Sequence, residues 1–156
     1  MKGEIKTYRG YNEEYGWVYG FLVINEDGWF IVNTDVIWLQ ENGFPGLEKR
    51  FQVNPMSVSQ KIGLDDEKDK TLFEFDIVEV TEPSTILHQN PETVKAVIEY
   101  DEESASYRAV VYENIKDFEK DDAYDVIPLH GDIFLRKIGN AFENRNLIEN
   151  SFKGTK

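Results

Sequence analysis

Two acidic side chains, Glu74 and Asp76, stand inside the apolar stretch LFEFDIVEV that runs from Leu72 to Val80. Burial shifts the ionisation of carboxylates, and acid–base chemistry uses groups tuned in this way. One interpretation is therefore a hydrolase built on Glu74 and Asp76. The other is structural: a buried carboxylate is costly unless it has partners, and Asp76 would accept backbone N–H bonds at a bend. We favour the structural role.

Other residue patterns that carry chemistry are missing from the chain. There is no cysteine, which excludes a thiol nucleophile and a zinc site built on cysteine. His88 and His130 lie far apart and form no metal-binding pair. The acidic clusters 65–67, 101–103 and 121–122 lack the ligand spacing of a calcium loop. No serine has a nucleophile-elbow context, and no glycine-rich phosphate loop is present. We expect no catalytic, cofactor or metal site and a protein that is not an enzyme.

The net charge of −13 is concentrated in the middle of the chain. Residues 61–130 hold 7 basic and 19 acidic side chains, a balance of −12, whereas residues 1–60 hold 5 and 8 and residues 131–156 hold 5 and 3. Such a surface repels a phosphate backbone, so nucleic acid is an unlikely partner. The alternative is that the protein is associated with nucleic acid. The protein would be an acidic DNA mimic or a direct binder through a local basic patch of Lys49, Arg50, Arg136, Lys137 and Arg145.

The chain has no hydrophobic leader in MKGEIKTYRG and no apolar run that approaches the ~18 residues of a membrane helix. We expect a soluble protein of the cytoplasm with no membrane partner.

Short runs rich in Val, Ile, Tyr, Phe and Trp, separated by turn residues, predict a mainly β protein. Residues 16–24 are apolar on both alternations, and NEDG at 25–28 predicts a tight turn into the next strand. Residues 93–112 predict a second hairpin, in which the first strand, residues 93–100, has one apolar face. Residues 34–43, 114–123 and the tail from 144 are candidate short helices. The expected organisation is an N-terminal β-meander in residues 1–54 and a small SH3-like barrel in residues 55–156.

Aromatic side chains crowd the N-terminal part of the chain. Trp17, Tyr19, Phe21 and Trp29 are the candidate interface residues, because aromatics are enriched at protein interfaces. Stacking on single-stranded bases is the alternative, but few basic residues accompany them. We expect a homo-oligomer that contacts itself through the meander, with a host or phage protein as a further candidate partner.

The stretch around DDEKDK predicts a hairpin whose charged tip faces solvent. Beyond it, the apolar side chains change faces at Ile77 and Val78. A change of phase inside a strand suggests a bulge or a sharp bend, as at the corner of a small barrel.

Three segments resemble the YopX family, small proteins of phages and prophages. The first reads Ile62, Gly63, Leu64, Asp65, Asp66, then Lys70, Leu72, Phe73, Glu74, Phe75, Asp76, Ile77, Val78. It is similar to the family pattern T-G-L-K-D-x-x-G-K-x-I-Y/F-E-G-D-I-V. The opening EIKTYRGYNEEYGWVYGFLV and the closing KIGNAFENRNL are similar to the family's ends.

The chain departs from the family at three positions. Phe75 and Asp69 stand where the family has glycine, and Arg145 stands where it has proline. Only glycine adopts positive φ freely. With Phe75 in place of glycine, we expect the chain to form the bend with a different backbone conformation.

The resemblance implies a mainly β, oligomerising, phage-encoded accessory protein of uncharacterised role, and it implies no reaction. We expect a protein-interaction module in a bacterial host cell. The residues whose family match implies a structural role are Gly63, Leu64, Asp66, Glu74, Asp76, Ile77, Val78, Gly139, Asn140, Glu143 and Asn144.

Overall fold

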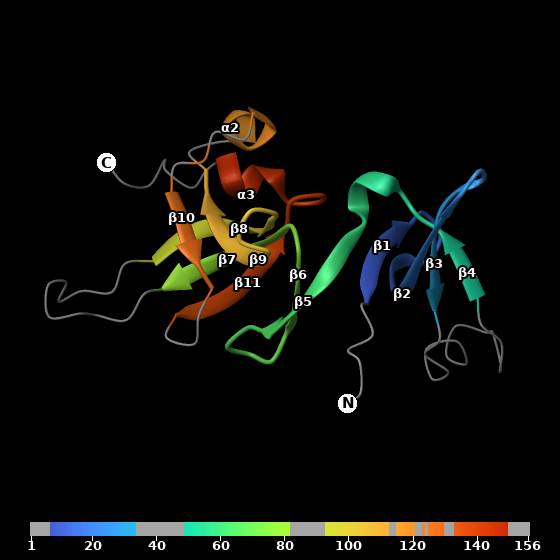
Figure 1. Ribbon diagram of the computed structural model, residues 1–156, viewed down its shortest axis with the longest axis horizontal. Coiled ribbons are helices and arrows are strands. Elements are labelled where there is room, and N and C mark those ends of the chain that lie inside the picture. The colour runs from blue at the N-terminus through green and yellow to red at the C-terminus, as the bar shows by residue number, and fades with distance from the viewer. Residues whose placement is uncertain are drawn as a thin grey trace, which may run out of the picture. The chain divides into compact units, whose positions relative to one another are not determined.

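The computed structural model describes residues 7–33, 49–81, 93–112, 115–120, 123, 125–129 and 133–149. In this part of the chain the protein is mainly β, with two antiparallel sheets and few short helices (Figure 1), as the sequence predicts. It divides into two compact units, Met1–Lys61 and Ile62–Lys156. Each is described by itself.

The first unit contains consecutive antiparallel strands β1 to β4, joined by the start of β5. Its strand order is β4-β3-β2-β1-β5, and neighbouring strands pair antiparallel. A 3-10 turn, Pro55–Ser57, precedes β5. The strands are β1 (Tyr8–Asn12), β2 (Gly16–Asn25), β3 (Gly28–Asn33), β4 (Lys49–Gln52) and the first residues of β5 (Ser59–Asp65).

One face of this sheet forms the first core, because alternate residues of a strand point to one side. Its buried members are Val18, Ile31, Phe51 and Val53. The tight turn predicted at NEDG is confirmed: Asn25 pairs with Gly28, and Gly28 has φ 134°, which glycine adopts readily.

The second unit contains a five-stranded sheet in the order β10-β9-β8-β7-β11. The end of β5 and β6 form the predicted hairpin beside it, and the hairpin predicted over 93–112 is β8 and β9. The elements are β6 (Thr71–Phe73), β7 (Asp76–Thr81), β8 (Thr93–Asp101), β9 (Ser106–Val111), α2 (Ile115–Lys120), β10 (Asp125–Pro128), β11 (Phe134–Asn140) and α3 (Arg145–Glu149).

Both faces of this sheet are covered. One face carries the larger core cluster, to which Val78, Ala96 and Ile98 belong, and the other carries Ile77 and Val97. The short helices α2 and α3 lie side by side in Figure 1 and contribute Phe118 and Leu147 to the second cluster. The middle of β8 is thus buried on both sides. The sequence predicts only one apolar face there, because it does not reveal the covering helices.

The irregularity predicted at Ile77 and Val78 lies on the neighbouring strand. Ile77 and Val78 themselves pair regularly with β8. Opposite them, the register of β11 shifts between Lys137 and Gly139, so that Ile138 is the extra residue. The change of phase in the sequence has another cause: β7 supplies apolar side chains to the cores on both faces, Ile77 to one and Val78 and Val80 to the other.

The five-stranded sheet is open, because the described strands show no pairing between its ends β10 and β11. The helix predicted at 34–43 and both histidines lie outside the described residues. Among the described helices, none has the length and apolar character that a membrane crossing requires.

Candidate functional site

Asp76 is the first residue of β7, and its side chain is fully buried. Its Oδ2 atom accepts the backbone N–H of Phe73 at 2.8 Å and lies 3.2 Å from Nζ of Lys137 on β11. The Lys137 ammonium also lies over the Phe73 ring, 5.9 Å from its centroid. Asp76 therefore ties the last residue of β6 to β7 and to β11. These are the bonds that the structural interpretation requires.

The turn between β6 and β7 is made by Glu74 and Phe75, and Phe75 adopts φ 65°. The backbone is thus left-handed at the position where the family has glycine, and the expectation of a differently made bend is wrong. Two backbone bonds hold the residue there. The Phe75 N–H donates to the Ile98 carbonyl at 2.7 Å, and its own carbonyl accepts the Ala141 N–H at 2.8 Å. The Phe75 side chain packs against the cluster of Ile77 and Val97, which offsets the cost of positive φ.

Asp66 organises the tip between β5 and β6. Its Oδ1 atom accepts the N–H groups of Lys68 and Lys70, both at 2.9 Å, and its Oδ2 atom accepts the N–H of Lys137 at 3.0 Å. Burial acts to raise the pKa of Asp66. The three backbone N–H groups and the charge of Lys70 prevail, and they hold this pKa below its ordinary value. Asp66 is therefore an ionised structural acceptor.

Asp69, in the same tip, has φ 60° and is exposed. Left-handed backbone costs an L-residue about 1–2 kcal/mol, less for Asp, so Asp69→Gly should raise the free energy of unfolding by about 0.5–1 kcal/mol. Lys68→Gly, one residue away, is the control and should lower stability through the greater entropy of the unfolded chain. Chemical denaturation of both variants measures the difference. If both variants lost the same free energy of unfolding, the assignment of backbone strain to Asp69 would be contradicted.

The closing motif forms a compact turn after β11. Asn140 Oδ1 accepts the N–H groups of Phe142 and Glu143, at 3.0 and 2.9 Å. Asn144 Oδ1 accepts the Asn140 N–H at 3.1 Å. A Cβ atom on Gly139 would lie 2.6 Å from that Asn144 oxygen, so glycine allows this approach. Glu143 Oε1 accepts from Asn140 Nδ2 at 3.2 Å.

The two family segments therefore meet, although more than sixty residues separate them in sequence. Asn140 pairs with Asp76, and Gly139 pairs with Ile77. We call Asp66, Asp76, Lys137, Asn140 and Asn144 the signature junction. Gly63 and Leu64 lie outside it in β5, and Ile77 and Val78 fill the two cores beside it.

Sequence reasoning placed Lys137 in a surface basic patch and missed its role in the junction. The signal that could have found it is the cost of burying Asp76 without a cation. Two other members of that patch form ion pairs of their own. Arg136 pairs with Glu79, and Arg145 Nη1 lies 3.0 Å from Glu119 Oε1. Arg50 belongs to the first unit and lies over the Phe30 ring. The side chain of Lys49 is not among those that the structure describes.

The two carboxylates of the acid–base alternative, Glu74 and Asp76, differ in burial. Asp76 is enclosed by the junction, whereas Glu74 is half-buried in the turn. Burial raises the pKa of Glu74, and a bond from the Tyr100 backbone opposes this. Neither residue lines the two grooves described below. Among the described residues, no group of three or more His, Cys, Asp or Glu side chains could hold a metal ion.

Three of the four candidate interface aromatics lie on one face of the first sheet. Trp17, Tyr19 and Phe21 alternate along β2 and point away from the first core, whereas Trp29 packs against that core. Val23 continues the same face, although it was not among the candidate interface residues. We call Trp17, Tyr19, Phe21 and Val23 the β2 stripe.

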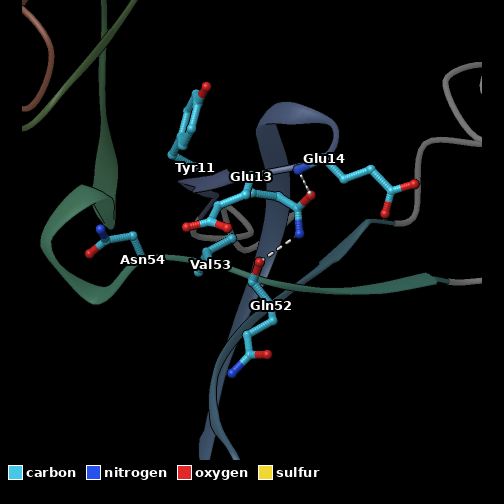
Figure 2. Close-up of a pocket in the computed structure, with 7 residues that line it drawn as sticks. Tyr11, Glu13, Glu14, Gln52, Val53 and Asn54 are labelled. Atoms are coloured by element: carbon cyan, nitrogen blue, oxygen red, sulfur yellow. Dashed lines mark hydrogen bonds between the residues drawn. The ribbon is translucent and has the colours of Figure 1, made fainter.

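A shallow groove of about 510 Å³ also lies in the first unit, and Figure 2 shows its lining residues. Asn12 accepts the Glu14 N–H at 2.9 Å and donates to the Gln52 carbonyl at 2.7 Å. Glu13 and Glu14 are exposed on the turn. Asn12 therefore fastens this turn to β4, and the two glutamates alone make no binding site. The lining residues are Tyr11, Asn12, Glu13, Glu14, Gln52, Val53 and Asn54.

The fold and the signature junction define a small antiparallel β protein of two units, the second fastened by buried carboxylates. The family model for the YopX protein matches residues 8–149, and the chain belongs to the YopX family. The comparisons with curated proteins and with solved structures gave no match.

Proposed function

We propose that this YopX-family protein is a non-enzymatic protein-interaction module that forms homo-oligomers through its first unit. It would be a phage or prophage accessory protein and act in the cytoplasm of the bacterial host, as the family resemblance implies. The observation that carries the proposal is the β2 stripe.

The β2 stripe is exposed although it is aromatic and aliphatic. Tyr19, Phe21 and Val23 keep 44, 39 and 38% of their surface accessible. They follow one another at alternate positions, so they present a continuous apolar row on the face opposite to the first core. Contiguous apolar surface of this kind marks association sites in soluble proteins. Its aromatic content is typical of the buried centre of an interface.

A second copy of the chain is the proposed occupant of the stripe. Two stripes brought together by a twofold axis would bury matching apolar rows, as isologous interfaces do. In the sequence, no charged residue interrupts the run from Gly16 to Ile24. The stripe itself therefore carries no charge, and Arg9 on the neighbouring strand β1 lies over the Trp17 ring.

The test is sedimentation velocity of the full chain at micromolar concentration. The wild type should sediment as an oligomer of the 18.2 kDa protomer. The double variant Tyr19→Ser/Phe21→Ser should associate at least about tenfold more weakly, because it removes the two exposed aromatic rings of the stripe. Ile24→Ser is the matched control: Ile24 lies on the same strand, is 55% exposed and points to the opposite face. A monomeric wild type, or an unchanged double variant, would refute self-association through the stripe.

An SH3-like barrel in the second unit remains part of the proposal. It is supported by the sharp turn at Glu74 and Phe75, the register shift in β11 and the hairpin of β5 and β6 beside the open sheet. For the nucleic-acid alternative, a gel shift that weakens steeply with salt would favour direct binding. Ion pairs already engage Arg136, Lys137 and Arg145, which disfavours that outcome.

A further inference from the structure

The second unit has an apolar groove at the junction of the β5–β6 tip and the start of β11. Its volume is about 290 Å³, at the small end of ligand sites and suited to a large side chain. The proposed self-association uses the first unit, so this groove is a separate surface. The residues that line it are Leu64, Asp65, Asp66, Glu67, Leu129, Ile133, Phe134 and Leu135.

The floor of the groove belongs to the protein core. Leu135 is buried in the larger cluster, and Leu129 and Ile133 pack against that cluster. Leu64, on the β5 side, keeps 44% of its surface accessible. A floor made by core side chains is held in place by packing. An incoming apolar group would therefore meet a surface that is already formed.

The β5–β6 tip is fastened to β11 beside this floor. The Glu67 N–H donates to the Leu135 carbonyl at 2.9 Å. One residue earlier, Asp66 Oδ2 accepts the Lys137 N–H at 3.0 Å. These two bonds fix the spacing between the walls of the groove. The Asp66 carboxylate accepts hydrogen bonds from the backbone of the protein and therefore does not face a ligand.

The rim of the groove is acidic. Asp65 and Glu67 are both exposed and flank the Asp66 backbone. They lie in the part of the sequence, residues 61–130, in which 19 acidic side chains outnumber 7 basic ones. An apolar floor with an acidic rim is complementary to an apolar side chain that has positive charges on either side.

We propose that this groove binds a segment of a partner protein in which one large apolar residue is flanked by Lys or Arg. Nucleic acid does not fit, since its phosphates would meet the acidic rim. A second copy of this chain is disfavoured. The exposed large apolar residues of the described part are Tyr15, Tyr19, Phe21, Val23, Ile24, Met56, Leu64, Tyr100, Val126 and Phe134. None of them has Lys or Arg as an immediate neighbour in the sequence.

The test uses a short synthetic peptide with a single leucine between two pairs of lysines, titrated into the isotope-labelled full chain. Amide NMR signals of residues 64–67 and 133–135 should shift, and added salt should weaken the binding. Two comparison peptides complete the design. One replaces the leucine by serine and keeps the charge, and the other replaces the lysines by glutamates and keeps the leucine. Each should bind at least about fivefold more weakly.

Two variants of the protein locate the binding. Leu64→Ser and Glu67→Lys should each weaken binding of the leucine peptide by about fivefold or more, by removing apolar contact and reversing a rim charge respectively. Val126→Ser is the matched control, because Val126 is a similarly exposed apolar residue of the same unit and does not line the groove. Retained binding in this control is expected.

Three outcomes would overturn the proposal: no shift at about 1 mM peptide, equal binding of the serine peptide, or unchanged binding by Leu64→Ser. The oligomeric state of the same samples is measured separately. A monomer that binds the peptide would refute only self-association, and an oligomer that does not bind would refute only the groove.

Discussion

Replacing Asp76 with alanine is expected to lower the free energy of unfolding of the second unit by about 3–4 kcal/mol. The fully buried carboxylate accepts the Phe73 N–H and pairs with Lys137. Removing it leaves a buried donor and a partly buried ammonium without this acceptor. Lys137 keeps about a quarter of its side chain accessible, so its ammonium can recover some hydration. The cost should therefore lie in the lower part of the range for broken buried pairs.

Chemical denaturation followed by circular dichroism measures this loss. Tryptophan fluorescence supplies an internal comparison, because all three tryptophans of the chain, at positions 17, 29 and 38, belong to the first unit. Asp125→Ala is the control. Asp125 also begins a strand but is exposed, so its loss should change stability by less than about 0.5 kcal/mol. If Asp76→Ala abolished an activity of the protein without lowering stability, the structural assignment would be wrong.

The second large effect is expected at Asp66, where alanine should cost about 2–3 kcal/mol. Three backbone N–H groups lose a charged acceptor, and the tip loses one of its links to β11. Lys68 and Lys70 are exposed, so water can satisfy part of what is lost, and the figure is lower than the full sum of three charged bonds.

Asp66 should also make stability depend on pH. Its pKa is lower in the folded protein than the ordinary aspartate value of 3.8. Its contribution is therefore present above that value and is lost as the pH falls through the folded pKa. The difference in unfolding free energy between the wild type and Asp66→Asn should shrink as the pH is lowered from about 5 to about 2. Other groups, such as Glu74 with its raised pKa, act in both proteins and cancel. A difference that stays constant over this range would show that the charge of Asp66 does not contribute.

Local patterns predicted the elements well. The turn at Gly28, the β8–β9 hairpin and the short helices α2 and α3 follow from alternation, turn residues and capping, all of which act within a few residues. The YopX family can also be recognised from the sequence, because its segments occur in order along the chain.

Features that depend on contacts between residues distant in the sequence could not be predicted from the sequence. The sequence predicts an irregularity on β7, whereas the register shift lies on β11, and the change of phase in β7 reflects side chains that enter two different cores. Burial of β8 on both faces depends on α2 and α3. Phe75 accepts positive φ only because Ile98 and Ala141 bond to its backbone and the second cluster holds its ring.

The sequence by itself determined a mainly β chain, the family and an acid inside an apolar strand that must have partners. Only the tertiary structure decided what those partners are, that Lys137 serves both Asp66 and Asp76, and that the β2 stripe and the apolar groove face outward. The physical reason is range. Backbone preferences and alternation act between neighbours in sequence, whereas the charge on Asp76 is compensated by a residue sixty-one positions away, which folding alone brings within 3.2 Å.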